Sequence, residues 1–251
     1  MHFSELNMTS LTPEFAIQLS QIQFAWPKQD TPTLLIDELT IPTQQHVFIK
    51  GPSGCGKSTL LSLLTGIITP QSGKITVLGQ PLNQLNQARR DQFRSHHIGY
   101  IFQQFNLLPY LSVIDNVLLP CRFSKIRKQR ALQSGSTLIE QAKQLLQRLH
   151  LPESVFERPI SDLSIGQQQR VAAARALIGQ PEIIIADEPT SALDHDNRQA
   201  FIELLIEEAN RSQASVIFVS HDSSLQAYFD RTIDLMTINS TSNFHPQGEH
   251  S

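Results

Sequence analysis

The sequence predicts an α/β fold, in which short apolar strands and amphipathic helices build layers around a mostly parallel sheet. Three short runs have continuous apolar centres, as expected for strands buried on both faces of such a sheet: Val47–Ile49, Ile183–Ala186 and Val216–Val219. A run with alternating apolar and polar residues, Phe15–Phe24, instead predicts a half-exposed antiparallel strand. The chain has 251 residues, of which 40% are hydrophobic, and can therefore bury a sizeable core.

The elements follow from the same patterns, taken in chain order. The predicted strands are Phe15–Phe24, Leu34–Leu39, His46–Lys50, Lys74–Leu78, Ile98–Phe102, Ile183–Ala186, Ser215–Ser220 and Thr232–Ile238. The predicted helices are Lys57–Gly66, Leu138–His150, Gly166–Ile178, Asp194–Asn210 and Ser223–Phe229.

We expect these elements to form a single domain over residues 13–238, with an antiparallel β subdomain near its N-terminus. Residues 84–178 are mostly helical in pattern and are expected to form a separate lobe. Within this lobe, the basic and polar stretch 123–137 predicts an exposed turn region. Residues 1–12 and 239–251 are polar and are expected to be flexible termini.

Composition excludes several classes of function. The net charge of −3 and the pI near 6.3 give no basic surplus, so a nucleic-acid partner is not expected. Two cysteines are too few for a disulfide framework. No run approaches the ~18 apolar residues that span a bilayer, and the N-terminus lacks the pattern of a signal peptide. We therefore expect a cytoplasmic protein that contacts a membrane only through a partner.

The clearest motif is GPSGCGKST at residues 51–59, which follows an apolar strand and opens an apolar helix. This is the P-loop pattern, in which glycines let successive N–H groups point at phosphate oxygens. Lys57 is expected to reach the β- and γ-phosphates of ATP, and Ser58 to offer its hydroxyl to Mg²⁺. Cys55 places a thiol in this loop, so alkylation is expected to block nucleotide binding. The residues expected to bind the nucleotide are Gly51, Pro52, Ser53, Gly54, Cys55, Gly56, Lys57, Ser58 and Thr59.

Two acids end a buried strand at Asp187 and Glu188. Beside a phosphate loop, Asp187 can hold Mg²⁺ and Glu188 can act as general base on the attacking water; without that loop, two solvated acids would be the simpler interpretation. The strand Ser215–Ser220 likewise ends at His221. That histidine could hydrogen-bond the γ-phosphate or orient Glu188.

At this point the sequence resembles the ATP-binding-cassette (ABC) ATPases. The segment LSIGQQQR at residues 163–170 is similar to their Leu-Ser-Gly-Gly-Gln signature, and it precedes the strand with the two acids, as in that family. YIFQQ at residues 100–104 resembles their Q-loop, which implies a catalytic and Mg²⁺-binding role for Gln103. Trp26 falls where the family stacks an aromatic ring on adenine, and His221 falls on the family's switch histidine.

The resemblance implies a P-loop NTPase fold of the ABC-ATPase type and a head-to-tail homodimer that encloses two ATP molecules. Each site would use the P-loop of one subunit and Ser164, Gly166 and Gln167 of the other. The sequence departs from the family at Ile165, which replaces the first signature glycine. A position that required φ above zero would be strained by this isoleucine, whereas one that required only a backbone N–H would tolerate it.

The segments 100–109 and 113–120 are similar to those of ATPases for macrolide export, lipoprotein release and cell division. Such a subunit is expected to lie peripherally on the inner face of the cell membrane and to drive a separate integral-membrane permease. The subgroup favours export or extraction of a lipoprotein, peptide or drug-like substrate. The alternative is a regulatory or mechanical ATPase that moves a partner without transport. A soluble ABC protein of translation or DNA repair is disfavoured, because the chain has neither a second cassette nor long coiled coils.

Overall fold

The computed structural model describes residues 13–133, 137–191 and 193–243 and contains two sheets. A four-stranded antiparallel sheet has the order β2-β1-β4-β5, and a five-stranded parallel sheet has the order β6-β7-β8-β3-β9. The strands are β1 Phe15–Phe24, β2 Leu34–Pro42, β3 His46–Lys50, β4 Ser72–Val77, β5 Gln80–Pro81, β6 Ile98–Ile101, β7 Ile183–Asp187, β8 Ser215–Val219 and β9 Arg231–Asp234. The α-helices are α1 Lys57–Leu64, α2 Gln87–His97, α3 Val113–Phe123, α4 Lys125–Leu132, α5 Leu138–Arg148, α6 Ile165–Leu177, α7 His195–Arg211 and α8 Leu235–Ile238.

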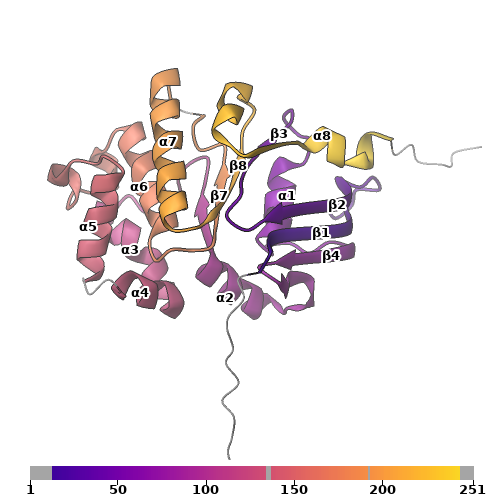
Figure 1. The fold of residues 1–251 in the computed structure, drawn as a ribbon, viewed down its shortest axis with the longest axis horizontal. Helices are drawn as coiled ribbons and strands as arrows, with labels where there is room; N and C mark the ends of the chain where they lie inside the picture. Colours follow the sequence, from indigo (N-terminus) through magenta and orange to yellow (C-terminus); the bar gives the residue numbers. More distant parts are fainter. Residues whose placement is uncertain (1–12, 134–136, 192, 244–251) are drawn as a thin grey trace, which may run out of the picture.

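The parallel sheet separates two apolar cores. Because side chains alternate along a strand, Phe48 of β3 joins the core on the side of α3 to α7, whereas Val47 and Ile49 join the core beneath the antiparallel sheet. The antiparallel strands β1, β2 and β4 and the helices α3 to α6 accordingly lie at opposite ends of the molecule (Figure 1). The expected α/β layering with an antiparallel sheet and a group of helices is therefore confirmed.

Two predictions near the C-terminus were wrong in part. The strand predicted over Thr232–Ile238 ends at Asp234, and the helix α8 follows at once. The reason is local, because the Asp234 side chain accepts a hydrogen bond from the Met236 N–H and so caps α8. The helix predicted over Ser223–Phe229 is instead a 3-10 helix, Ser223–Tyr228.

The stretch 123–137 was also predicted wrongly as an exposed turn. Most of it forms α4, whose N-terminus is capped by the Ser124 side chain, and Arg127 of this helix is buried. The range 84–178, predicted as mostly helical, also contains the strand predicted over Ile98–Phe102, which forms β6 and pairs with β7 in the parallel sheet. The expected helical lobe therefore contains an edge strand of the core sheet.

The C-terminal boundary expected at residue 238 is too early. The next residue, Asn239, is buried; its side chain accepts from the Leu35 N–H at 2.8 Å and donates to the Thr33 carbonyl at 3.1 Å. A 3-10 helix, Ser240–Asn243, follows it. The expected flexible terminus at residues 1–12 lies outside the described residues, as do residues 244–251 of the one expected at 239–251.

Candidate nucleotide site

The loop between β3 and α1 has a backbone shape suited to an anion. Gly54 and Gly56 have φ angles of 80° and 103°, in the left-handed region that favours glycine. A Cβ on Gly56 would lie 2.8 Å from Cδ2 of Leu34, so a larger residue would need that side chain to move. α1 begins at Lys57 with no acidic residue in its first turn, so no side chain of this turn neutralises the positive end of the helix dipole, which faces the loop.

The amine of Lys57 lies within this loop. Its Nζ donates to the carbonyl oxygens of Gly51 at 2.8 Å and Pro52 at 3.0 Å, and it lies 3.8 Å from Oε1 of Glu188. Only 8% of the side chain is exposed. The positive charge therefore acts in a poorly solvated place, where its attraction for phosphate oxygens is stronger than in water.

A cleft of about 870 Å³ opens over the loop. This volume lies within the roughly 300–1,000 Å³ typical of small-molecule sites. Most of the residues that the sequence assigns to the nucleotide meet here: Trp26, Ser53, Gly54, Cys55, Gly56, Lys57, Ser58, Thr59, Gln103, Asp187 and Glu188 all line the cleft.

Asp187 ends β7 beside two hydroxyl groups. Ser58 Oγ and Tyr100 Oη each lie 3.5 Å from its Oδ2, at the outer limit of a hydrogen bond. Burial, followed by the charge of Glu188, raises the pKa of Asp187, and the contacts with Ser58, Tyr100 and Lys57 oppose this rise. Ser58, Asp187 and Gln103 offer a hydroxyl, a carboxylate and an amide oxygen, which are the hard oxygen donors that Mg²⁺ prefers.

The donor set suits Mg²⁺ at a phosphate rather than a metal held by protein alone. Within the described ranges, no three His, Cys, Asp or Glu side chains gather in a way that could hold a metal ion. A Mg²⁺ ion at a nucleotide needs only one or two carboxylates, because phosphate and water oxygens complete its shell. The residues present therefore fit a Mg²⁺–nucleotide complex.

Glu188 connects the two strand ends that flank the cleft. Its N–H donates to the Val219 carbonyl of β8 at 2.9 Å, and its φ of 45° lies in the left-handed region that non-glycine residues rarely adopt. Its Oε2 lies 3.3 Å from Nδ1 of His221, which follows β8. The Glu188 side chain is 20% exposed and that of His221 is 65% exposed, so the histidine can reach a ligand from the solvent side.

The indole of Trp26 forms one wall of the cleft and is 40% exposed. Its Nε1 donates to Oγ1 of Thr59 at 3.3 Å, and its ring packs edge-on against Phe24 with 5.2 Å between centroids. These two contacts hold the plane of the indole in place beside the phosphate loop. An aromatic ring with an exposed face here can stack on a nucleotide base.

The signature segment opens α6. Ser164 caps this helix reciprocally with Gln167, whose Oε1 accepts the Ser164 N–H at 3.0 Å. Ile165 is the first helical residue, 52% exposed, and its φ is not positive, so its backbone is unstrained. A Cβ on Gly166 would meet only Leu193 Cδ2, at 3.9 Å. The predicted site residues that do not line the cleft are Gly51, Pro52, Ser164, Gly166, Gln167 and His221.

Sequence reasoning missed several residues of the site. Tyr100 was noted only as part of a motif, yet it reaches Asp187 from the neighbouring strand. Arg198 of α7 donates to Oδ2 of Asp222 at 2.9 Å, next to His221. Met236 and Asn239 line the cleft from the C-terminal segment. The strand order could have indicated Tyr100, but no sequence pattern places the C-terminal segment beside the loop.

Comparisons with known proteins agree with this geometry. The profile of the ABC transporter family matches residues 36–191. The LolD ATP-binding protein of a lipoprotein-releasing system from Psychrobacter arcticus is 39% identical over 196 residues, 78% of this chain and 84% of the relative. The YbbA protein of Escherichia coli K12, described as an uncharacterized ABC transporter ATP-binding protein, is 37% identical over 199 residues, 79% of this chain and 84% of YbbA.

A solved structure has the same fold. The ATP-binding cassette MJ0796, as a post-hydrolysis dimer with ADP and Pi, gives a TM-score of 0.76 at 32% identity, over 87% of this chain and 93% of that chain. In the described ranges of the present chain, we find no helix that combines the length and apolar character of a membrane span. With the family profile, these relatives and the site in agreement, the chain belongs to the ABC transporter family, as an ATP-binding subunit that has the ABC-ATPase fold and hydrolyses ATP.

Proposed function

We propose that this subunit hydrolyses ATP at a site completed by a second copy of the chain. The observation that supports this is the position of the signature residues. Ser164 and Gly166 stand at the N-terminus of α6, outside the cleft that holds the phosphate loop and the acids. The small Gly166 leaves the N–H groups of the first turn approachable, and the dipole favours an anion there. The γ-phosphate of an ATP molecule bound to a partner is the expected anion.

Within one cleft, each residue has a defined role in this proposal. The loop N–H groups and Lys57 hold the β- and γ-phosphates, and Trp26 stacks on the adenine. Ser58, Asp187 and Gln103 would hold Mg²⁺, which supplies positive charge against the phosphate oxygens when bound. The other residues from 51 to 59 contribute backbone and hydroxyl contacts.

The chemistry depends on Glu188 and His221. The Glu188 carboxylate is expected to take a proton from the water whose oxygen attacks the γ-phosphorus, while the bond to the β–γ bridging oxygen breaks and its electrons leave with ADP. His221 Nδ1 lies 3.3 Å from Oε2 of the same carboxylate, so it can orient Glu188. From an exposed position it can also donate to a γ-phosphate oxygen. These roles of the two residues are compatible in one catalytic cycle.

We further propose that the dimer drives an integral-membrane permease, from a cytoplasmic position on the inner face of the membrane. The relatives named as lipoprotein-releasing ATP-binding proteins support export or extraction of a lipoprotein-like substrate. Near the Q-loop, Tyr110 is 76% exposed and Phe102 is 37% exposed, and both are candidates for the permease contact. Phe105, in the same segment, is buried in the core and is unsuited to that role.

A mass measurement tests the composite site. Glu188→Gln should bind ATP but hydrolyse it slowly, so its mass in solution should change from monomer to dimer when Mg-ATP is added. The same change should fail when Ser164→Ala is combined with it. Dimerisation that needs no ATP, or that survives the Ser164 substitution undiminished, would contradict the proposal.

A further inference from the structure

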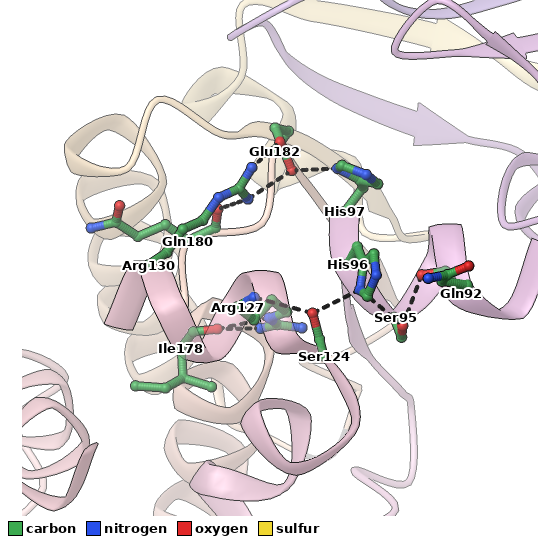
Figure 2. Close-up of polar contacts among 10 residues, drawn as sticks. All are labelled: Gln92, Ser95, His96, His97, Ser124, Arg127, Arg130, Ile178, Gln180 and Glu182. Carbon is green, nitrogen blue, oxygen red and sulfur yellow. Dashed lines mark hydrogen bonds and ion pairs between the residues drawn. The ribbon is translucent and has the colours of Figure 1, made fainter. Parts of the chain in front are cut away.

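The C-terminal end of α6 is bound by a buried arginine from α4. Arg127 is 3% exposed. Its Nε donates to the Ile178 carbonyl at 2.8 Å, and its Nη2 donates to the carbonyls of Ala176 at 2.6 Å and Arg175 at 3.3 Å. These carbonyls belong to the last turn of α6 and the residue after it, where a helix leaves acceptors without partners. Figure 2 shows the contact between Arg127 and Ile178. Arg127 therefore caps α6 from another helix.

The charge of Arg127 is balanced by the helix end rather than by an acid. No carboxylate in the described ranges lies within ion-pair distance of its guanidinium. Burial lowers its pKa to about 10, so it remains charged at neutral pH. The C-terminus of a helix carries partial negative charge, which favours a cation at that place. The planar fork of an arginine can serve several carbonyls at once, which the single amine of a lysine cannot do in the same geometry.

The same end of α6 has little space on either side. A Cβ on Gly179, just beyond the helix, would lie 2.5 Å from the Arg127 carbonyl oxygen. A Cβ on Gly99 of β6 would lie 2.2 Å from the Ala176 carbonyl oxygen. Backbone therefore packs directly against backbone on both sides, and this end of α6 is fixed between α4 and β6.

The loop after Gln103 is fastened to the same end of the helix. Arg175 donates to the carbonyls of Phe105 and Asn106, both of which have positive φ angles. Burial lowers the pKa of Arg175 as well. The last turn of α6 thus contacts α4, β6 and the segment that continues from a proposed Mg²⁺ ligand.

The helix α4 is in turn tied to α2. The Ser124 Oγ accepts the Arg127 N–H at 3.1 Å and lies 2.8 Å from Nδ1 of His96, at the end of α2 (Figure 2). One turn along α4, Arg130 pairs with Glu182, whose other oxygen lies 3.1 Å from Nδ1 of His97. Since α2 runs directly into β6, these contacts join α4 to the edge of the core sheet.

The opposite end of α6 carries the signature. Ser164 and Ile165 are exposed there, and the helix of 13 residues places them about 20 Å from the fixed end, at ~1.5 Å per residue. A tilt of about 5° at the fixed end would move the signature by roughly 1–2 Å, and a misplacement of ~1 Å in a catalytic site can cost about 100-fold in rate.

We propose that Arg127 is a positioning residue for the signature end of α6: by fixing the C-terminal end of this helix against α4 and β6, it sets where Ser164 meets the nucleotide of the partner subunit. This inference rests on the proposed function, because it requires Ser164 to contact ATP across the dimer. Arg127 itself touches neither nucleotide nor metal ligand. Its effect should therefore fall on closure of the dimer and not on binding of ATP to one subunit.

The test uses Arg127→Lys in the Glu188→Gln background. Mg-ATP affinity of the dilute monomer is measured by calorimetry, and dimerisation at saturating Mg-ATP is measured by light scattering. Lysine keeps the charge but loses the fork, so we expect ATP affinity within about threefold of the parent and a dimer dissociation constant at least ~10-fold higher. With Glu188 intact, kcat should fall by a similar factor while KM changes little.

The matched control is Ile75→Val, a core truncation in the antiparallel sheet. It should lower the melting temperature without weakening the dimer. The inference is overturned if the dimer dissociation constant of Arg127→Lys is unchanged, or if Ile75→Val weakens the dimer equally. If Arg127→Lys does not fold, Ser124→Ala is used in its place. This substitution removes the cap of α4 and the His96 contact but keeps Arg127. The Ser124→Ala variant must weaken the dimer in the same way.

Ser164→Ala separates the two proposals. If it abolishes dimerisation while Arg127→Lys does not weaken it, the positioning role is wrong and the composite site stands. If Ser164→Ala leaves dimerisation unchanged, the composite site itself is wrong, and the positioning role falls with it.

Discussion

Nδ1 of His221 lies 3.3 Å from Oε2 of Glu188, although the two residues follow different strands of the sheet. Strand pairing brings them together, because β7 and β8 are parallel neighbours with Asp187 opposite Val219. The backbone N–H of Glu188 donates to the Val219 carbonyl of β8, and the imidazole of His221 approaches the Glu188 carboxylate, so this carboxylate has few orientations left. The pair should therefore act as a unit.

Substitutions at this pair should be non-additive. Glu188→Gln should lower kcat by roughly 10²–10⁴, the range of a general base, and His221→Ala should have a smaller effect. In the double variant, His221→Ala should lower kcat little further, because the carboxylate that His221 contacts has already been removed. Steady-state ATPase assays of the wild type, the two single variants and the double variant give the coupling energy between Glu188 and His221. Fully additive losses would mean that His221 acts on the phosphate alone.

Alkylation of Cys55 should abolish ATP binding. Cys55 lines the cleft, and an adduct on its thiol is expected to enter the space of the phosphates. Mg-ATP should protect it from maleimide, as followed by mass spectrometry and ATPase rate. Cys121 is buried and provides the internal control, since it should not react in the folded protein. Cys55→Ser should keep its ATPase activity and resist inactivation by maleimide. Loss of activity when this variant is treated with maleimide would show that inactivation does not occur at Cys55.

Removal of the indole of Trp26 should weaken nucleotide binding. An aromatic stack contributes about 0.5–1.5 kcal/mol, so Trp26→Ala should raise the Kd of ATP by roughly 2–12-fold, with Trp26→Phe closer to the parent. Calorimetry with ATP and with inorganic triphosphate separates the causes. The triphosphate affinity should not change, because it has no base to stack. An equal loss for both ligands would indicate a disturbed phosphate loop.

The isoleucine of the signature should obstruct closure sterically, not through its backbone. Ile165 has helical geometry and an exposed side chain at the proposed interface. In the Glu188→Gln background, Ile165→Gly should therefore lower the protein concentration needed for the ATP-dependent dimer, with a melting temperature changed only slightly. Ile165→Ala is the control that keeps a Cβ. It should give most of the decrease in the protein concentration that dimerisation requires. A weaker dimer in both variants would show that the isoleucine contributes to the contact.

Acidification should loosen the contact between α2 and α4. Burial, then the charges of His97 and Arg130, lower the pKa of His96, and Glu182 opposes them only in part. The folded state thus favours neutral His96, while the unfolded chain takes up a proton near pH 6.5, so stability is lost as the pH falls below about 6.5. His96→Asn keeps an acceptor for Ser124 without this titration. Thermal unfolding between pH 7.5 and 5.5 should show a steeper loss in the wild type; equal slopes would exclude this role.

Much of the site could be predicted from the sequence because its parts are local. The phosphate loop needs only a strand, glycines and a helix in succession, and the acids need only the end of an apolar strand. β1 and β3 were predicted with the same bounds as in the structure. Parallel strands then bring Asp187 and His221 to the same edge without further information.

The parts that escaped prediction depend on distant contacts. The stretch around Arg127 is basic and reads as exposed, yet the free carbonyls of α6 stabilise a buried guanidinium that no local pattern reveals. The strand predicted across Asp234 failed because a side-chain cap outweighed the β-branched pattern. Tyr100 required the order of the strands, which single runs do not encode.

The side chain of Asn239 bonds to Leu35 and Thr33, more than 200 residues earlier, and Asn239 lines the same cleft as Trp26. The late part of the chain is thus a piece of the wall of the candidate nucleotide cleft. A truncation before Asn239, or an affinity tag fused directly to it, would alter that wall. Comparisons of nucleotide affinity between preparations therefore need identical C-terminal ends.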